Sequence, residues 1–310
     1  MIRSICLNPV IDRMYYIDDF IAGKLHKGIA PLAYPGGKGV NIARVVSLLG
    51  EPCALYGFLG GLGGQLIARE MEQLDVQLRT ISLEGECRVT INIMDRKNNR
   101  ETEITEPGPA VSPQELARFF AELEQDTQPG DVVICSGSAV AGMPEDVYKT
   151  VSEICARKKA ECFLDTSAQY LSGALPGNYR FAKPNANELN FLFGLSGKPN
   201  LAEMVKLGQR AREQGIGQVL ISMGGEGGLL VEESRALLAE IPPVETVSTI
   251  GSGDSTVAGF AVGVSRGLAP EDCLRLAMAC GVCNATYSKV GFVEKEQVKQ
   301  LTEKIRLKAI

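Results

Sequence analysis

Short apolar runs alternate with amphipathic stretches along most of the 310-residue chain, and this alternation limits the choice of fold more than any other feature. Two of the amphipathic stretches, Pro113–Glu124 and Pro144–Lys158, have the apolar spacing of helices. Strands that alternate with helices build a mainly parallel sheet with helices on both faces. The sequence therefore predicts an α/β fold with strands at Arg3–Leu7, Cys53–Leu59, Asp131–Ser136, Glu161–Asp165, Tyr179–Pro184 and Gln218–Ser222.

Two segments, 13–35 and 87–106, lack any helical pattern. In the second, Val89, Ile91 and Ile93 alternate with polar residues before an Asn-Asn turn. Such alternation is typical of a sheet with one covered face. The first segment has the same character around an Ala-Gly turn. Together they predict a small β-sheet inserted into the α/β body, with two surface hairpins of no further role as the alternative.

A glycine-rich motif, Thr249-Ile-Gly-Ser-Gly-Asp-Ser, precedes apolar residues at helical spacing, so a helix should begin near Gly253. Glycines at a helix start let backbone N–H groups converge on an anion, and the helix dipole strengthens the attraction. Asp254 in the first turn could be a capping residue. Phosphoryl transfer to a hydroxyl offers a second explanation, because it needs a carboxylate to accept the hydroxyl proton and donors to stabilise the moving charge.

A second glycine loop, Pro35-Gly-Gly-Lys-Gly-Val-Asn, also opens a helical pattern. Its spacing is not that of a P-loop. Closely spaced glycines allow the backbone to approach a ligand, and the amide of Asn41 can both donate to and accept from sugar hydroxyls. Taken alone, the loop could equally be a tight turn.

The net charge of −5 argues against a surface for nucleic acid or anionic membranes. An anionic substrate would then be held by a few local Lys, Arg and backbone N–H groups. No apolar run approaches the roughly 18 residues of a membrane span, and the N-terminus lacks the features of a signal peptide. The nine cysteines have no zinc-site spacing, and Cys280 and Cys283 fall in a helical pattern, so we expect reduced core thiols in a cytoplasmic protein.

The two glycine motifs together resemble the signatures of the ribokinase/PfkB carbohydrate kinase family. Gly36–Ala43 matches the first signature, and Ser248–Phe260 matches the second, with Ser252 where many members have alanine. The resemblance implies a ribokinase-like three-layer α/β/α sandwich with a mainly parallel central sheet and a small β-sheet lid. The expected kinase body comprises residues 1–12, 36–86 and 107–310, and the expected lid comprises residues 13–35 and 87–106, which would exclude water from the transferring phosphate.

The resemblance also implies the residues that bind ATP and transfer its phosphate. Asp254 would be the catalytic base, and the backbone N–H groups of Gly251, Ser252 and Gly253 would stabilise the phosphoryl group. Lys183–Glu188 resembles the family's K-P-N-x-x-E motif, which implies that Asn185 and Glu188 organise Mg²⁺, mostly through water. Ser222–Gly228 resembles a turn that lines the nucleotide site. The expected nucleotide-binding residues are therefore Lys183, Asn185, Ser222, Gly224, Gly225 and Gly227.

The opening Leu7-Asn-Pro-Val-Ile-Asp12 resembles the phosphosugar branch of the family, in which this aspartate lies at a strand end and binds sugar hydroxyls. An Asx-turn cap is the alternative for an isolated aspartate. Arg88 stands where the branch places an arginine that meets the substrate phosphate, and a guanidinium suits a phosphate through paired hydrogen bonds. The expected substrate-binding residues are Asp12, Gly37, Lys38, Asn41, Arg88 and Lys27. The three cations among them, Lys38, Arg88 and Lys27, are candidates for binding the phosphate of the substrate.

The favoured reaction is phosphorylation of fructose 1-phosphate to fructose 1,6-bisphosphate by ATP, with tagatose 6-phosphate and then fructose 6-phosphate as alternative acceptors. Glu101–Pro109 resembles a motif of the first two kinases but departs from it at Thr105, which leaves the sugar open. A non-catalytic sugar-phosphate sensor is an alternative of another class, against which the intact Asp254, Asn185 and Glu188 speak. The edges of an exposed β lid could pair in a homodimer, and the sequence leaves monomer and dimer undecided.

Overall fold

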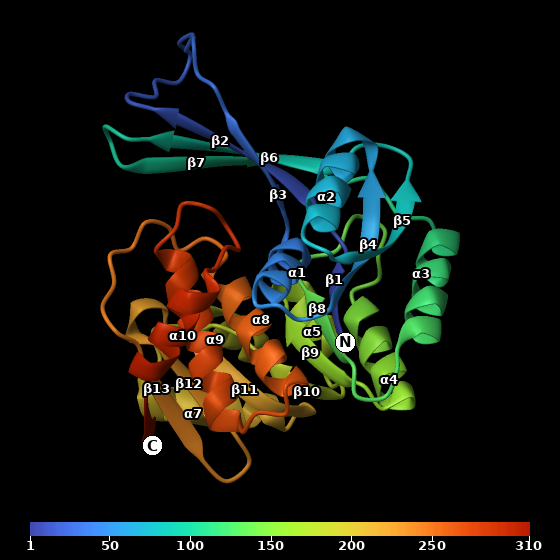
Figure 1. Ribbon diagram of the computed structural model, residues 1–310, viewed down its shortest axis with the longest axis vertical. Helices are drawn as coiled ribbons and strands as arrows, with labels where there is room; N and C mark the ends of the chain where they lie inside the picture. Colours follow the sequence, from blue (N-terminus) through green and yellow to red (C-terminus); the bar gives the residue numbers. More distant parts are fainter.

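The structure is a computed structural model that describes residues 1–310, apart from the side chain of Ala168. Its larger sheet is built from ten strands in the described residues (Figure 1). These strands are β1 (Ile2–Cys6), β4 (Cys53–Gly60), β5 (Gln77–Leu83), β8 (Val132–Ser136), β9 (Glu161–Asp165), β10 (Tyr179–Ala182), β11 (Ile216–Ser222), β12 (Gly228–Val231), β13 (Ala236–Glu240) and β14 (Arg306–Ala309).

The strand order is β14-β13-β12-β11-β10-β9-β8-β1-β4-β5. All neighbours from β11 to β5 pair in parallel, whereas β12, β13 and β14 are added antiparallel at one edge. The predicted mainly parallel sheet is confirmed. The antiparallel edge was not predicted, because its strands are only four or five residues long.

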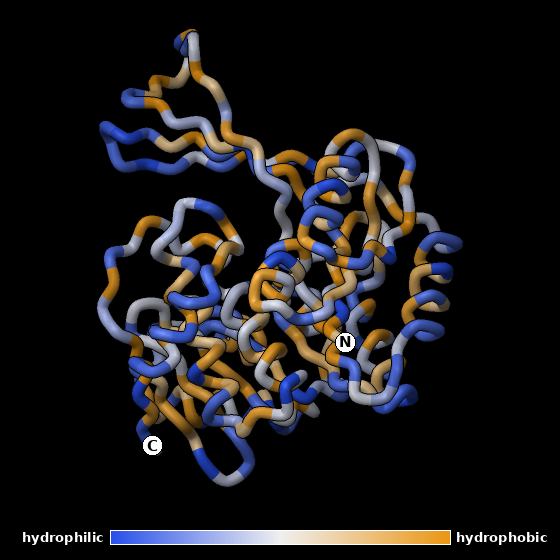
Figure 2. The backbone as a smooth tube through the Cα atoms, viewed as in Figure 1, coloured by the Kyte–Doolittle hydropathy of each residue, from blue (hydrophilic) through white to orange (hydrophobic). Residues whose placement is uncertain are grey.

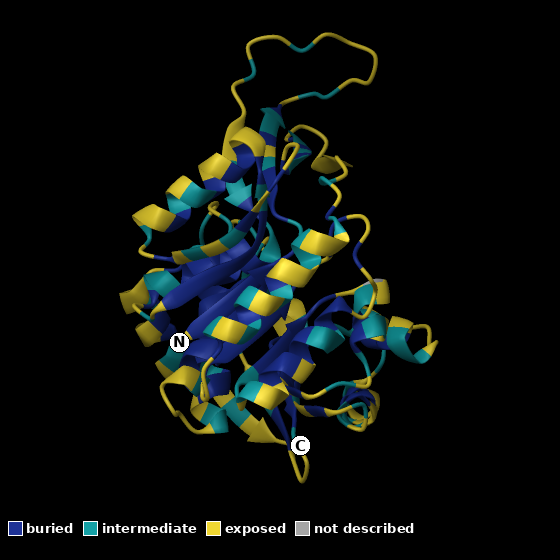
Figure 3. Ribbon diagram, turned by 90° about the vertical axis from the view of Figure 1, so that its right-hand side faces the viewer, coloured by how far each residue is buried: buried dark blue, intermediate teal, exposed yellow. Residues whose placement is uncertain are grey.

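Helices cover both faces of this sheet and complete the three layers. They are α1 (Lys38–Leu48), α2 (Gly61–Gln73), α3 (Pro113–Asp126), α4 (Val147–Lys158), α5 (Ala168–Ala174), α6 (Ala186–Phe193), α7 (Leu201–Arg212), α8 (Ser252–Ser265), α9 (Pro270–Ala285) and α10 (Lys295–Lys304), with a 3₁₀ turn η1 (Gly224–Glu226). Successive strand residues point to opposite faces, so Val133 joins the core under α3 to α7, while Ile134 joins the core under α1, α2 and α8 to α10. Figure 3 shows the sheet buried between helices whose outer faces are exposed.

A second sheet of four strands projects from the body (Figure 1). Its strands are β2 (Val10–Ile17), β3 (Leu32–Gly36), β6 (Arg88–Asp95) and β7 (Arg100–Thr105), in the order β3-β2-β6-β7. The strand β2 begins earlier than expected, so Asp12 is the third residue of β2 and does not lie at a strand end. The outer strand β7 is exposed throughout and mostly hydrophilic (Figure 2).

The cysteines follow the expectation for core residues. All nine are buried and none forms a disulfide in the described part of the chain. Cys280 and Cys283 lie in α9 with no exposed surface, which confirms their prediction as small core residues. Every helix in the described residues is too short or too polar to span a membrane.

Candidate active site

The polar residues singled out in the sequence gather where the parallel strands end. Asp165 is the last residue of β9, Lys183 directly follows β10, and Ser222 ends β11. The helices α1 and α8 begin at the same edge of the sheet. In open α/β sheets, ligands bind outside the carboxyl ends of the strands because loops and helix N-termini converge there.

The start of α8 forms an uncapped anion site. Gly251 is its N-cap residue with φ of 79°, a left-handed conformation that favours glycine, and no side chain caps the first turn among the described residues. A Cβ at Gly253 would lie 3.2 Å from Nζ of Lys183, which brings a buried ammonium beside this turn. Free N–H groups, the helix dipole and a cation therefore point to one place.

Asp254 lies in that first turn, but its carboxylate contacts other segments. Asn41 of α1 donates from Nδ2 to Oδ2 of Asp254 at 2.9 Å, and Nζ of Lys38 lies 4.0 Å from Oδ1. Asp254 is 6% exposed. Burial raises its pKa, against the opposing effects of Lys38 and of the Asn41 hydrogen bond. A buried carboxylate with a raised pKa at the sheet edge is suited to accept a proton.

Asp165 binds two lysines from different elements. Lys38 donates a hydrogen bond to its Oδ2 at 3.0 Å, and Lys183 lies 3.2 Å from its Oδ1 as an ion pair without hydrogen-bond geometry. Burial would raise the pKa of Asp165, but Lys183 and Lys38 outweigh it and hold that pKa below its usual value. Burial would likewise lower the pKa of Lys38, whereas Asp165 and Asp254 raise it. Asp165 and Lys38 are therefore held in their charged forms.

Asp12 and Arg88 lie on the small sheet at its junction with the body. Val10 pairs with Arg88 and Asp12 pairs with Thr90 in the parallel ladder between β2 and β6, so Asp12 and Arg88 share one face. Burial raises the pKa of Asp12 to about 6, even though Arg88 lowers it. A Cβ at Gly36 of β3 would collide with the Asp12 carboxylate, so glycine there leaves the carboxylate in its present position.

Arg88 is a cation without a carboxylate partner. No ion pair involves it in the described part of the chain, and its Nε is buried without a hydrogen-bond acceptor. A buried donor without a partner loses its hydration without compensation. This side chain is therefore ready to receive an anionic group.

A cavity of about 320 Å³ opens on the other side of the α8 start. Ser222, Gly224, Gly225 and Gly227 line one wall, and Ser252, Gly253 and Thr256 line its floor. The remaining wall is apolar and comprises Ile241, Val244, Met278, Val282 and Ala285. Gly224 and Gly227 have φ of 58° and 97°, which the turn between β11 and β12 requires. A largely apolar cavity beside an anion site suits a ligand that has an apolar ring and a phosphate.

Known proteins match this chain over nearly its whole length. A family model described as pfkB family carbohydrate kinase covers residues 5–296. A curated 1-phosphofructokinase of Bacillus subtilis (strain 168) is 32% identical over 307 residues, which are 99% of both chains.

The chain belongs to the pfkB family of carbohydrate kinases. It is therefore a phosphotransferase that acts on an alcohol. A Staphylococcus aureus protein with a provisional assignment as a phosphofructokinase has a TM-score of 0.86 at 28% identity, over 100% of this chain and 99% of its own. Phosphofructokinase-2 of Escherichia coli has a TM-score of 0.89 at 22% identity over 98% of each chain, a likeness that concerns the fold. One structure of that protein is described as a tetrameric inhibited form.

Two predicted residues of this pfkB kinase, Asn185 and Glu188, are joined in a capping box at the start of α6. The Asn185 side chain accepts from the Glu188 N–H at 2.9 Å, and Oε2 of Glu188 accepts from the Asn185 N–H at 2.8 Å. The ordinary role of a helix-start acid is thus present in the structure. It leaves the other carboxylate oxygen of Glu188 and the Nδ2 group of Asn185 for further partners.

Lys27 is the predicted residue that the structure does not bring to the site. It is exposed in the connection 18–31, which leaves the far end of β2, whereas Arg88 begins β6 at the end nearest the body (Figure 1). No ion pair of Lys27 occurs in the described part of the chain. Lys38, by contrast, lies at the site but is engaged by Asp165 and Asp254.

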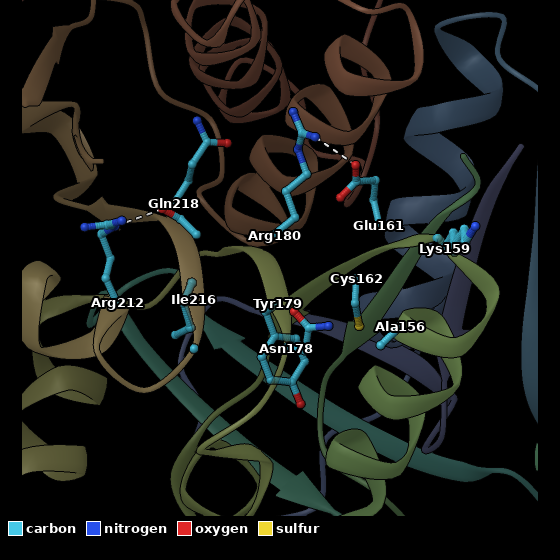
Figure 4. Close-up of a pocket in the computed structure, with 13 residues that line it drawn as sticks. Ala156, Lys159, Glu161, Cys162, Asn178, Tyr179, Arg180, Arg212, Ile216 and Gln218 are labelled. Atoms are coloured by element: carbon cyan, nitrogen blue, oxygen red, sulfur yellow. Dashed lines mark hydrogen bonds and ion pairs between the residues drawn. The ribbon is translucent and has the colours of Figure 1, made fainter. Parts of the chain in front are cut away.

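A larger groove, of about 790 Å³, lies at the opposite edge of the same strands (Figure 4). It is lined by the first residues of β9, β10 and β11, including Glu161, Arg180 and Gln218. Arg180 is paired with Glu161 there, and Nε of Arg212 donates to the carbonyl of Gly217. These groups satisfy one another and lie at the amino ends of the strands, so the smaller cavity is the better candidate for the active site.

Three residues near the pfkB site were not expected from the sequence. Asp165 could have been found, because it ends a predicted strand at the edge where ligands bind. Asn284 is fully buried in α9 and holds the backbone at the start of α8. It donates to the Ile250 carbonyl at 2.9 Å and to Oγ of Ser252 at 3.1 Å. A lone polar residue in an apolar helical pattern was its only signal. Arg44 in α1 gave no signal in the sequence, because its partners lie either far away along the chain or in the same helix.

Proposed function

We propose that this kinase uses ATP to phosphorylate a ketohexose phosphate, with conversion of fructose 1-phosphate to fructose 1,6-bisphosphate as the favoured reaction. The observation that carries the proposal is the unpaired Arg88 beside Asp12 on the small sheet. A neutral sugar would leave that guanidinium without a partner, whereas a phosphate group satisfies it through paired hydrogen bonds. The resemblance to the Bacillus subtilis relative over the whole chain supports the choice of fructose 1-phosphate.

In this proposal the sugar lies between the small sheet and the start of α8. Asp12, the backbone at Gly37 and the Asn41 amide bind its hydroxyls, while Arg88 binds the phosphate that it already carries. Asp254 accepts the proton of the attacking hydroxyl. Its carboxylate is held by Asn41, and removal of the proton turns the hydroxyl into a better nucleophile.

The moving phosphoryl group would be stabilised by fixed positive charge. The N–H groups of Gly251 and Gly253 at the uncapped helix start would donate to it, with Lys183 beside Gly253, whereas the Ser252 N–H donates to the Thr249 carbonyl at 3.1 Å. We assign Lys38 to this side too, because its ion pair with Asp165 holds it close to Asp254. Such preorganised charge is the main source of catalysis in phosphoryl transfer. The nucleotide base would occupy the apolar cavity beyond Gly225 and Gly227.

The residues also fit the Mg²⁺ that accompanies ATP. No group of three carboxylate, His or Cys side chains in the described residues could hold a metal by itself. Mg²⁺ on a nucleotide needs only one or two carboxylates, because waters and phosphates complete its octahedron. The oxygen of Glu188 outside the capping box is available, with Asn185 acting through water, whereas Oδ1 of Asp165 is already paired with Lys183. When bound, the ion would neutralise charge on the phosphates.

The small sheet would act as a lid over the sugar. Its segments follow the proposed division into residues 13–35 and 87–106 apart from the body, although β2 extends into Val10–Asp12 and β3 into Gly36. Exposed apolar side chains on it, Ile21, Leu25, Leu32 and Ile104, would be covered if two lids met in a homodimer. In such a dimer the exposed Lys27 of one subunit could approach the site of the other.

Tagatose 6-phosphate is the second candidate substrate. Thr105 departs from the motif of the related kinases, and it stands in one row with Thr90 and Asp12, because β7, β6 and β2 pair in that register. Oγ1 of Thr105 lies 3.5 Å from Oγ1 of Thr90. We place the sugar against this row, so the side chains in the row would help to decide which orientation of the sugar hydroxyls near Asp12 is accepted.

A substrate panel tests the proposal. ADP release is measured with fructose 1-phosphate, fructose 6-phosphate, tagatose 6-phosphate and free fructose under identical MgATP. We expect the highest kcat/KM with fructose 1-phosphate and a large loss with free fructose, since only that sugar lacks the phosphate for Arg88. Preference for free fructose would refute the role of Arg88. Absence of turnover with all four, together with binding of a sugar phosphate, would favour a sensor.

A further inference from the structure

Arg44 is a buried cation that joins four segments around the site. It is 1% exposed and lies in α1, one turn after Asn41. Its Nε and Nη2 donate to the two carboxylate oxygens of Glu70 in α2, at 3.2 and 2.9 Å. Its Nη1 donates to Oδ1 of Asn41 at 2.9 Å and to the carbonyl of Val290 at 3.1 Å, and Nη2 also donates to the carbonyl of Pro35 at 2.6 Å.

The contact with Asn41 decides how that amide is oriented. A guanidinium can only donate, so the oxygen of the amide must face Arg44. The NH₂ group of Asn41 is therefore directed to Asp254, to which it donates at 2.9 Å. If the amide were reversed, its oxygen would meet the carboxylate and its NH₂ group would meet a cation. Arg44 thus imposes on Asn41 the one orientation that gives Asp254 a donor.

Through the carbonyl groups of Pro35 and Val290, Arg44 is also connected to the small sheet and to the start of α8. Pro35 belongs to β3, next to Gly36, which lies against Asp12. Val290 precedes Gly291, and a Cβ at Gly251 would lie 2.8 Å from the backbone nitrogen of Gly291. Both ends of the proposed substrate site, the root of the small sheet and the α8 start, are therefore fixed to one side chain.

Glu70 holds Arg44 in this position. The pair is bidentate, and the Glu70 side chain is only 19% exposed. Because a buried arginine is costly unless a carboxylate pairs with it, loss of the charge of Glu70 would loosen all of the contacts of Arg44. Lys289 also lies near Glu70, at 3.5 Å, on the surface side.

We propose that Arg44, held by Glu70, is a positioning residue that orients the Asn41 amide toward Asp254 and fixes the root of the small sheet to the α8 start. This inference rests on the proposed role of Asp254 as the base. It extends the active site to two residues that contact neither the nucleotide cavity nor the face that carries Asp12 and Arg88.

The principal variant is Glu70→Gln, which keeps the size of the side chain and removes its charge. We expect kcat to fall about tenfold, within the range of coupling found for residues in one hydrogen-bond network, with the KM for ATP unchanged within about twofold. The acidic limb of the pH profile of kcat should move to higher pH, since Asp254 loses a well-oriented donor. The side chains of the other charged groups near Asp254, namely Lys38, Lys183, Asp165 and Asp12, are kept; because Arg44 also lowers the pKa of Asp12, the profile is measured in an Asp12→Asn background as well. In an Asn41→Ala background the same change should have little further effect.

Asp131→Asn is the matched control. It removes the carboxylate from another buried arginine, Arg3, whose Nη2 lies 2.8 Å from Asp131 at the far end of β1. This variant should lose stability without a change in the pH profile. If Glu70→Gln behaved like Asp131→Asn, losing stability while kcat and its pH profile stayed as in the wild type, the positioning role would be overturned.

A measurement without substrate separates this inference from the proposed function. The pH dependence of the free energy of unfolding is compared for Glu70→Gln in the wild-type and Asp254→Asn backgrounds. If Arg44 acts on Asp254, the pH-dependent part of the Glu70→Gln effect should differ between the two backgrounds. An identical pH dependence in both would overturn the inference, whichever sugar the enzyme uses. Inactivity of the wild type on the sugar panel would instead count against the proposed function alone.

Discussion

The ammonium of Lys38 donates a 3.0 Å hydrogen bond to Asp165, a residue at the end of a strand in the middle of the sheet. From the sequence, Lys38 was a candidate for the phosphate of the sugar. In the structure it lies between Asp165 and Asp254, with 33% of its side chain exposed. Its charge therefore acts on the proposed base, and Arg88 on the small sheet remains the candidate for the phosphate of the sugar.

Replacement of Asp254 by asparagine tests the base. We expect kcat to fall by ~10²–10⁴, since an amide cannot accept the hydroxyl proton. The fold should persist, because burial already disfavours the charged form of this residue and raises its pKa. Steady-state kinetics and thermal unfolding measure the two effects. A variant with near-normal kcat would remove Asp254 from the mechanism.

Arg88→Ala should mainly raise the KM for the sugar phosphate. Loss of a hydrogen-bonded charge pair with the phosphate predicts a rise on the order of tenfold or more, with a smaller effect on the KM for ATP. Arg100→Ala is the control, because Arg100 lies exposed at the outer end of β7 on the same sheet and should leave both constants unchanged. An unaltered KM in Arg88→Ala would move the phosphate site elsewhere.

The raised pKa of Asp12 predicts how stability varies with pH. Burial raises this pKa from its ordinary 3.8 to about 6, so the folded protein binds the proton more tightly than the unfolded chain does. As pH rises from about 4 to about 6, the free energy of unfolding must therefore decrease because Asp12 loses its proton. Above about pH 6 this loss of stability is complete and stays constant. Asp12→Asn should therefore be more stable than the wild type at pH 8, by about 3 kcal/mol at most.

Chemical denaturation of Asp12→Asn and the wild type at several pH values provides the measurement. The difference in unfolding free energy should shrink toward pH 4. A difference that stayed constant from pH 4 to pH 8 would show that Asp12 does not titrate in this range. Because Asp12 is proposed to bind the sugar, the same variant should also have a raised KM for the sugar phosphate.

Asp165→Asn should destabilise the protein. It leaves Lys183, which is 5% exposed, without its carboxylate, and breaking a buried ion pair typically costs ~3–5 kcal/mol. The control lies on the same strand: Glu161→Gln breaks an ion pair with Arg180 in which both side chains are 39% exposed, and should cost no more than ~1 kcal/mol. Urea unfolding of both variants tests the contrast. Equal losses would mean that the buried cluster contributes no more than a surface pair.

Much of this protein could be predicted from its sequence, because the signals are local. Alternating apolar runs and helical periodicity indicated the parallel sheet, since burial on both faces makes each strand apolar over its length. The glycines at 36, 37, 39, 251 and 253 marked two helix starts, because left-handed or closely approached backbone disfavours a Cβ. These glycines also brought Asn41 and Asp254 into the candidate site, as they sit in the first turns that the glycines open.

Tertiary structure decided which charges meet. Asp165 and Lys38 come from a strand and a helix far apart in the chain, and nothing local to either residue indicates the other. The same holds for Arg44, whose helical pattern does not distinguish a solvated arginine from one that reaches Glu70, Pro35 and Val290. Pairing of this kind depends on the packing of α1 against α2 and the sheet. The sequence by itself thus determined the fold and the helix start that carries Asp254, while only the packed structure decided which cations act on that carboxylate, because electrostatic effects depend on distances and burial that distant segments create.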